Sequence, residues 1–223
     1  MTLASGAHAV LSSLRWPDED AAAHAWLDAF TGHRIALVPR GEADRWGRQR
    51  IDAVAEDSEA DLAGGLIAAG LAYADPGEAD SLCRPALRLV EAVARARGLG
   101  LWRTPPLLAE DGAALRRLAG RFGVVEGRIR HVGERSARTY LDFVPRGADG
   151  LVVIVTKRTW RALAGRGLTA ATLRDRRVRV RGIIELWHGP TIEAATADAM
   201  EVLDDEAPGP ESGPARIDSG VRR

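Results

Sequence analysis

The first half of the chain alternates short apolar runs with longer amphipathic stretches. The short runs have the length and composition of β-strands; they lie at residues 9–14, 34–38 and 51–54. The longer stretches have helical spacing and lie at residues 61–73 and 82–96. In the second stretch, Leu87, Val90 and Ala94 share one face of a helix. This half is therefore predicted to be a small β-rich unit with two to three helices.

The second half is dominated by strand patterns. Alternating or buried apolar runs occur at residues 122–132, 138–143, 151–155, 177–184 and 191–194. A helix built on Trp160 and Leu163 is predicted within residues 157–175, between the third and fourth strands. Three strands, a helix and two strands follow the order of an OB barrel. Gly182 would allow the tight bend that a barrel strand needs.

Proline and glycine mark the boundaries between these units. Thr-Pro-Pro at residues 104–106 is predicted to end a first domain at residues 1–106. Residues 107–119, with acids early and arginines late, are predicted to form a linker helix. The second domain would span residues 120–204. The tail at residues 205–223 is rich in Pro, Gly, Ser and acids and is predicted to be disordered.

One segment between two predicted strands concentrates chemically useful side chains. Residues 44–48 read Asp-Arg-Trp-Gly-Arg. Gly47 permits the positive φ of a tight turn, and the ring of Trp46 is expected to anchor the bend. Arg48 would then be presented on a rigid turn, where its guanidinium can hold a phosphate bidentately. The alternative is an ordinary hairpin with a solvated arginine.

Three motifs in this order resemble the staphylococcal-nuclease (thermonuclease) family, over about residues 3–103. They are the Asp–base–aromatic–Gly–Arg turn at residues 44–48, a run ending in Gly70-Leu71-Ala72, and Gly100-Leu101-Trp102. The resemblance implies an OB-type barrel in the first half. The predicted fold class is therefore mostly β with helices (α+β), built as two OB-type barrels, the first with two to three helices.

The resemblance implies phosphodiester cleavage only where the family's catalytic groups are present. Those groups are metal-binding carboxylates, a general-base glutamate and two phosphate-binding arginines, which suit a hard cation and a charged transition state. Here Val10 aligns with a phosphate arginine, Arg15 with a metal carboxylate and Asp18 with the glutamate. The strand with the family's Asp-Gly-Asp-Thr motif would precede Met1. Arg48 and Asp18 remain as catalytic candidates, and we expect no metal site and little or no cleavage.

The second half also resembles nucleic-acid-binding OB domains, over about residues 120–203. That resemblance implies single-stranded nucleic acid as the partner, on the face of the second and third strands. Four arginines at alternating positions are expected to face outward and line a phosphate groove; they are Arg128, Arg130, Arg179 and Arg181. Tyr140 and Phe143 are three residues apart, so one can stack on a base, with Tyr140 as the candidate, while the other belongs to the core. A solvated barrel exterior is the alternative.

Composition narrows the functional classes. The formal net charge is zero, but residues 1–106 carry 11 basic and 15 acidic side chains, whereas residues 107–204 carry 17 and 12. The acidic balance disfavours strong nucleic-acid binding by the first half, and the basic balance permits it in the second. We expect no membrane span and no signal peptide, which leaves the compartment open. The lone Cys83 and five scattered histidines indicate neither a disulfide framework nor a metal cluster.

Three functions are compatible with these patterns. The first is a degenerate thermonuclease-like protein that binds nucleic acid or another partner, without a cofactor and with little or no cleavage. The second is an active calcium-dependent endonuclease whose missing carboxylate comes from an upstream stretch of the reading frame. The third is a structural module for protein partners. Val10 and Arg15 favour the first, because an arginine repels the cation that a carboxylate would bind.

Overall fold

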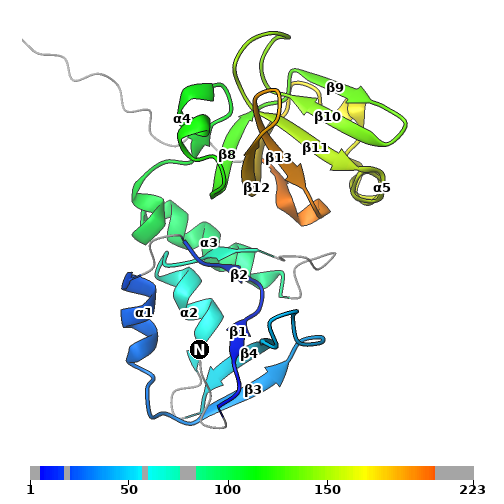
Figure 1. Ribbon diagram of the computed structural model, residues 1–223. Helices are drawn as coiled ribbons and strands as arrows, with labels where there is room; N and C mark the ends of the chain where they lie inside the picture. The colour runs from blue at the N-terminus through cyan, green and yellow to red at the C-terminus, as the bar shows by residue number, and fades with distance from the viewer. Residues whose placement is uncertain (1–5, 18–20, 57–59, 76–83, 204–223) are drawn as a thin grey trace, which may run out of the picture.

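The computed structural model describes residues 6–17, 21–56, 60–75 and 84–203. This part of the chain is an α+β structure with six α-helices, in agreement with the predicted mostly-β class with helices. Figure 1 shows two halves, with the N-terminal half below the C-terminal half and helix α3 (Ala86–Ala96) along their boundary. The 3₁₀ helix η1 (Gly100–Arg103) precedes the crossing into the second half.

The first half is built on a small mixed sheet. Its strands are β1 (Ala9–Leu11), β3 (Ile35–Pro39), β4 (Gln49–Ala55) and β5 (Ala60–Asp61). Strand β4 is parallel to β1 and antiparallel to β3 and β5. A separate strand pair joins β2 (Leu14–Arg15) to β6 (Tyr73–Ala74). The strands expected at residues 34–38 and 51–54 are thus confirmed.

Three α-helices lie in the described part of this half: α1 (Ala21–Asp28), α2 (Leu62–Ala68) and α3. Helix α1 was not predicted, because its run of alanines carries no clear apolar periodicity. Helix α2 begins where the Asp61 carboxylate accepts a hydrogen bond from the Gly64 N–H at 3.0 Å. The start of the helix expected at residues 82–96 lies outside the described residues.

The second and third sequence motifs meet in space. The Leu101 N–H donates to the Gly70 carbonyl at 2.8 Å. A Cβ on Gly70 would lie 2.2 Å from the Leu99 carbonyl oxygen, and one on Gly100 would lie 2.3 Å from the Gly70 carbonyl oxygen. Both glycines also have positive φ, +70° and +51°. The two motifs are therefore required for a close backbone crossing, which is a structural role.

The second half is a strongly curled sheet. Its strands are β7 (Leu107–Leu108), β8 (Phe122–Arg128), β9 (His131–Glu134), β10 (Arg138–Asp142), β11 (Val152–Thr156), β12 (Arg177–Leu186), β13 (Pro190–Ala194) and β14 (Met200–Val202). They are ordered β7-β8-β12-β13-β11-β10-β9, with β14 beside β12. Strands β8 and β9 are consecutive in the chain but stand near opposite ends of this order. The sheet therefore curls far enough to bring these two strands together around one apolar core.

Local chemistry divides several elements that the sequence predicted as continuous. The helix expected at residues 157–175 is two helices, α5 (Lys157–Gly165) and α6 (Ala170–Leu173), because Gly167 has φ +80° and Thr169 starts a new capping box. The expected linker helix at residues 107–119 is shorter. Its first residues form β7, parallel to β8, and α4 (Gly112–Arg117) begins only after Asp111 caps it. The predicted disordered tail lies outside the described residues.

The two halves repeat one pattern of connections. In the first half, β1 is followed by α1 and then by β3 and β4, with β1 parallel to β4 and β3 antiparallel to β4. In the second half, β11 is followed by α5 and then, after α6, by β12 and β13, with the same two orientations. The two halves thus share a strand–helix–strand–strand unit, although their sequences show no obvious repeat.

The halves pack against each other. Tyr73 from the first half meets Trp102 edge-on at 5.4 Å between ring centroids and Phe122 from β8 at 5.5 Å. The guanidinium of Arg15 lies 5.1 Å from the ring centroid of Phe122. Ala94 and Val124 complete this cluster. The sequence had not predicted whether the halves interact, and this cluster shows that they form a continuous apolar contact.

Candidate functional site: the groove between the halves

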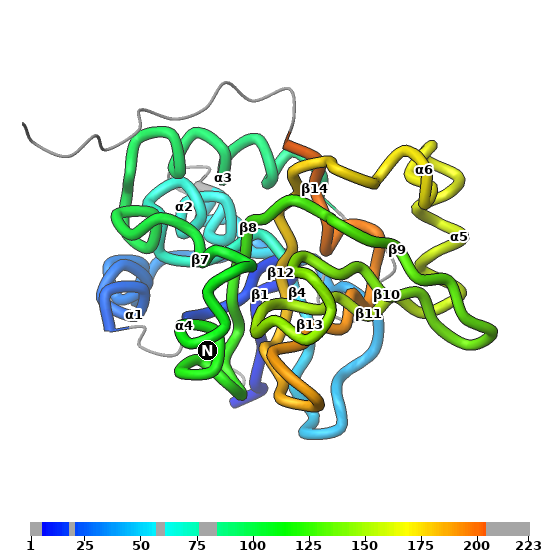
Figure 2. Tube along the Cα trace, turned by 90° about the horizontal axis from the view of Figure 1, so that it is seen from above, coloured from blue at the N-terminus to red at the C-terminus, as the bar shows by residue number. Residues whose placement is uncertain are grey.

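An open groove of about 1330 Å³ runs between the two halves. Its lining residues come from both halves, and in Figure 1 the β3–β4 hairpin of the first half lies below β12 and β13 of the second. One side comes from the first half and is called the arginine wall; it contains Arg15, Arg40, Arg45, Arg48 and Arg50 with Trp16 and Trp46. The other side is called the β12–β13 wall; it contains Arg181, Gly182, Ile183, Glu185, Glu193, Ala195, Thr196 and Ala199. Figure 2 shows the same chain from above.

The turn at residues 44–48 is organised by one carboxylate. Asp44 Oδ1 accepts from the N–H groups of Trp46 and Arg48, both at 2.9 Å, and Oδ2 accepts from Arg48 Nε at 2.8 Å. Gly47, with φ +74°, closes the turn. Desolvation alone would raise the pKa of Asp44, but the hydrogen bonds from Arg48 and Trp46 outweigh it and lower the pKa. The predicted rigid turn is thus present.

The ring of Trp46, which was expected to anchor the bend, lies outside the core of the first half. Its side chain is 63% exposed. The guanidinium carbons of Arg45 and Arg48 lie 4.0 and 4.8 Å from its ring centroid, so both cations are held against the ring by cation–π attraction. Among the described residues, Arg48 uses only Nε for its side-chain ion pair, which leaves its two terminal nitrogens for another acceptor.

Two further arginines of this wall are fixed by carboxylates behind them. Asp52 accepts from Arg40 Nε at 2.7 Å and also from the Ser12 hydroxyl. Its pKa is lowered, because the hydrogen bonds from Ser12 and Arg40 outweigh the effect of desolvation, which acts in the opposite direction. Arg15 lies 3.5 Å from Asp75. The guanidinium groups are therefore oriented before any ligand arrives, which reduces the entropy lost on binding.

The groove brings together three of the positions that the resemblance aligns with catalytic groups. Val10, Arg15 and Arg48 all line it. Asp18 lies outside the described residues. Within the described ranges, no three His, Cys, Asp or Glu side chains are grouped so that they could hold a metal ion. The chemistry available in this groove is therefore hydrogen bonding and charge, from the arginines and tryptophan rings of one wall and from carboxylates such as Glu185 and Glu193 on the other.

Arg179 and Arg181 are not exposed phosphate ligands, which corrects the sequence prediction. Both are 2% exposed. Arg181 Nη1 donates to Glu91 Oε2 at 2.9 Å and to the Ala74 carbonyl at 2.6 Å, and Nη2 donates to Glu201. Arg179 pairs with Glu126 at 2.7 Å and with Glu201 at 3.1 Å.

The alternation along β12 predicts correctly which side chains point away from the core, but not whether those side chains are exposed. Val178 and Val180 face the core of the curled sheet, so Arg179 and Arg181 do point away from it. That outer face is covered by α3 of the first half, where Glu91 is 1% exposed, and Glu201 on the neighbouring strand β14 pairs with both arginines. The sequence did contain a signal for this burial. Glu91 comes four residues after Leu87 and three before Ala94, so it lies on the buried face of the helix, and an acid there implies a buried cation.

The remaining predicted nucleic-acid residues lie away from the groove. Arg128 and Arg130 are exposed, and Arg128 donates to the carbonyl of Asp175. Tyr140 is half-buried on β10, whereas Phe143 is 1% exposed in the core, as expected for one member of that pair. The predicted set is therefore divided between a buried interface and a separate surface, and the arginine wall, apart from Arg48, was not predicted.

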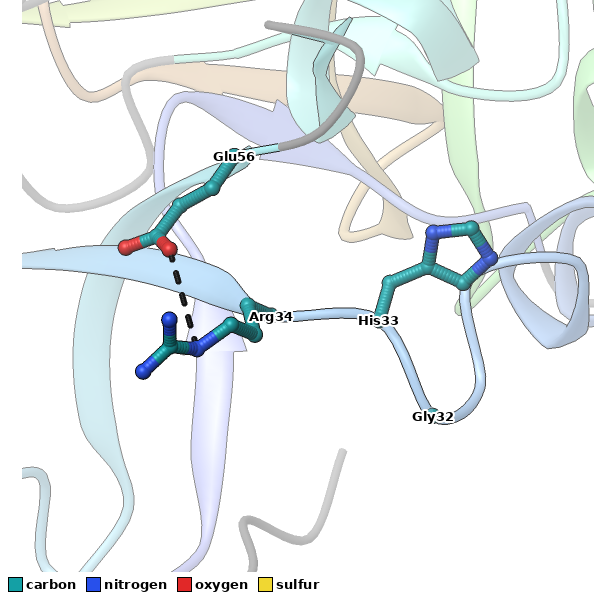
Figure 3. Close-up of a pocket in the computed structure, with 4 residues that line it drawn as sticks. All are labelled: Gly32, His33, Arg34 and Glu56. Carbon is teal, nitrogen blue, oxygen red and sulfur yellow. Dashed lines mark ion pairs between the residues drawn. The ribbon is translucent and has the colours of Figure 1, made fainter.

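A second, smaller hollow of about 480 Å³ lies at the other end of β3 (Figure 3). It is lined by Gly32, His33, Arg34 and Glu56. Arg34 Nε lies 4.0 Å from Glu56 Oε2, and the Arg34 side chain is 91% exposed. Figure 3 shows the His33 ring turned away from this ion pair. Its charged groups do not converge, so this hollow is a weak candidate.

Comparison with known proteins identifies no family. No protein-family model matches the chain, and no curated protein matches its sequence. Among the described residues, no helix combines the length and apolarity needed to cross a bilayer.

Proposed function

We propose that this protein is a degenerate thermonuclease-like module that binds single-stranded nucleic acid in the groove between its halves, with little or no cleavage. The observation that supports this most directly is the arginine wall. Arg15, Arg40 and Arg48 are each oriented by a carboxylate, and Arg45 and Arg48 are held against an exposed tryptophan. Cations that track a backbone beside aromatic rings are what single-strand binding requires.

The repeated connection pattern supports the proposed architecture of two OB-type barrels. If β8 and β9 are counted together as one strand, the second half has the five strands of such a barrel, and the other four are β10, β11, β12 and β13. The strand–helix–strand–strand unit of the first half then corresponds to the last three strands of the same plan. OB barrels commonly bind oligonucleotides. A fold by itself does not define a function, so the proposal depends on the arginine wall.

The low cleavage activity follows from the chemistry of two positions. Val10 offers no hydrogen-bond donor to a phosphate. Arg15 brings a positive charge to the place where a metal carboxylate is expected, and it is already paired with Asp75. A divalent cation placed beside this guanidinium would be repelled rather than held. Binding should therefore be the same with EDTA and with calcium.

The test is equilibrium binding of a fluorescent single-stranded DNA oligonucleotide across a range of salt concentrations, with cleavage followed in the same tube. The double variant Arg45→Ala, Arg48→Ala should lose roughly tenfold or more in affinity. Its salt slope should fall by about 1.4, since each phosphate contact on a single strand contributes about 0.7. Arg117→Ala is the matched control, because Arg117 is exposed and lies on α4 outside the groove.

The other outcomes of this test would support a different function or a different binding surface. Cleavage that needs calcium would establish the endonuclease alternative. Absence of any salt-dependent binding would favour a structural module for protein partners. Loss of binding only in the double variant Arg128→Ala, Arg130→Ala would move the ligand to the β9–β10 surface. Substituting Arg179 and Arg181 would not be informative, because both are buried and their loss would destabilise the fold.

A further inference from the structure

Two buried polar groups have no hydrogen-bond partner among the described residues, and both belong to residues that line the groove. They are Arg181 Nε and Thr196 Oγ1. Arg181 is 2% exposed and Thr196 is 5% exposed. Thr196 stands at the start of the 3₁₀ helix η2 (Ala197–Ala199), but its hydroxyl caps none of the helix N–H groups. A buried polar group without a partner is unfavourable, so it would gain from a ligand atom that accepts hydrogen bonds. Arg181 Nε is out of reach of a ligand, because the Arg181 side chain has no exposed surface, which leaves the Thr196 hydroxyl.

The β12–β13 wall differs in charge from the arginine wall opposite. The Arg181 guanidinium is already neutralised by Glu91 and Glu201. The other charged residues of this wall are Glu185 and Glu193, both exposed. The apolar residues Ile183, Ala195 and Ala199 lie beside them. This wall repels a phosphate but suits a neutral, partly apolar group that carries an acceptor.

We infer that the β12–β13 wall receives the acceptor edge of a nucleobase. This inference rests on the proposed binding of single-stranded nucleic acid and specifies its orientation. The phosphates lie along the arginine wall, and the bases point across the groove toward Thr196 Oγ1. A nucleotide has an anionic backbone and a neutral base rich in carbonyl and ring-nitrogen acceptors, which matches the two unlike walls.

The Thr196 hydroxyl is covered in the free protein, so its engagement requires a rotation of the side chain. Thr196 lies in the segment between β13 and η2, and rotation about χ1 exchanges the positions of the hydroxyl and the methyl group. The base contact therefore depends on a hydroxyl that contributes no hydrogen bond to the free protein. Its removal should affect ligand binding and stability in opposite directions.

The experiment compares two probes of equal length, an oligo(dT) strand and an abasic deoxyribose-phosphate strand, on the full chain. The wild-type protein should bind oligo(dT) more tightly. Thr196→Val should weaken oligo(dT) binding about three- to tenfold, the effect of one hydrogen bond, and should leave abasic binding unchanged. Its thermal midpoint should stay equal or rise, because an unpaired buried hydroxyl has been removed. Thr196→Ser keeps the hydroxyl and should retain the preference for oligo(dT).

Thr139→Val is the matched control. Thr139 Oγ1 is also buried without a partner among the described residues, but it lies on β10 and does not line the groove. It should alter stability in the same direction and leave both affinities unchanged. Unchanged oligo(dT) binding by Thr196→Val, or equal binding of the two probes by the wild type, would overturn the base contact. Equal binding that still depends on Arg45 and Arg48 would leave the proposed function intact, whereas absence of binding to either probe would remove both.

Discussion

Replacing Glu91 with alanine tests the idea that the two halves are joined by a buried ion-pair network. Glu91 is 1% exposed, and it accepts from Arg181 Nη1 at 3.1 and 2.9 Å and from the Ala74 N–H at 2.8 Å. The substitution removes all three bonds. It leaves the fully buried Arg181 with Glu201 and the Ala74 carbonyl as its remaining partners. Water cannot replace the lost carboxylate, because the Arg181 side chain has no exposed surface.

Breaking a buried ion pair by removing one partner costs about 3–5 kcal/mol. Arg181 keeps Glu201, so we expect the lower end, about 3 kcal/mol, out of a total stability of roughly 5–15 kcal/mol for a folded protein. Urea unfolding followed by tryptophan fluorescence and by circular dichroism measures this loss. In the variant, the urea midpoints measured by the two signals should also differ, because the halves lose their main polar connection.

The double variant Glu91→Leu, Arg181→Met provides the control. It removes both charges together and should recover most of the lost stability, because no unpaired charge remains buried. Asp149→Asn removes one partner of the exposed pair with Arg116, at 2.8 Å, and should have a clearly smaller effect. A loss below about 1 kcal/mol for Glu91→Ala would refute a buried network, since that is the range of surface ion pairs.

Three further predictions concern the turn, the backbone crossing and the response to acid. Trp46→Ala should weaken single-stranded DNA binding in a fluorescence titration by about 0.5–1 kcal/mol, the strength of an exposed cation–π contact, because its ring holds Arg45 and Arg48 in place. The urea midpoint should stay unchanged, since the ring is 63% exposed; a shifted midpoint would indicate a core role. Gly70→Ala should destabilise far more than Gly47→Ala in thermal unfolding, because both have positive φ but only a Cβ on Gly70 collides with the backbone; equal losses would argue against the crossing. Glu201 has a lowered pKa, because its arginine neighbours outweigh the desolvation that would raise it. The ionised Glu201 therefore stabilises the folded state fully above the usual pKa of 4.5, and this contribution disappears as the pH falls through the lower folded-state pKa. Acid unfolding should therefore be less steep in Glu201→Gln than in the wild type, and identical profiles would contradict this.

The arginines of β12 show where reasoning from sequence succeeds and where it stops. Alternation assigned Val178 and Val180 to the inside and Arg179 and Arg181 to the outside, and the core confirms it. Whether an outer face meets solvent or another part of the chain depends on contacts with distant segments, such as that of Arg181 with Glu91 of α3. Arg88 of α3, for instance, pairs with Glu201 of β14. No local pattern encodes such a pairing.

The same limit applies to the arginine wall. The turn at residues 44–48 was predictable, because an Asp, a Gly and flanking strands define its geometry within a few residues. Arg40 and Arg15 were not recognised as members of the same surface. They reach it only because β1, β2 and the β3–β4 hairpin border one groove. The exposure of the Trp46 ring and its contacts with two arginines were not predicted either, because the turn alone does not define which of its sides meets solvent.

By itself, the sequence determined the α+β class, the turn at residues 44–48 with its Gly47, and the strands on either side of it. These features depend on side-chain period, φ and hydrogen bonds that form within a few residues. The tertiary structure alone decided that the halves pack together, that Arg179 and Arg181 are buried, and that Arg48 and Thr196 line opposite walls of one groove. Those properties arise from surfaces brought together by folding, where burial and pairing of charge depend on partners that are distant in the chain.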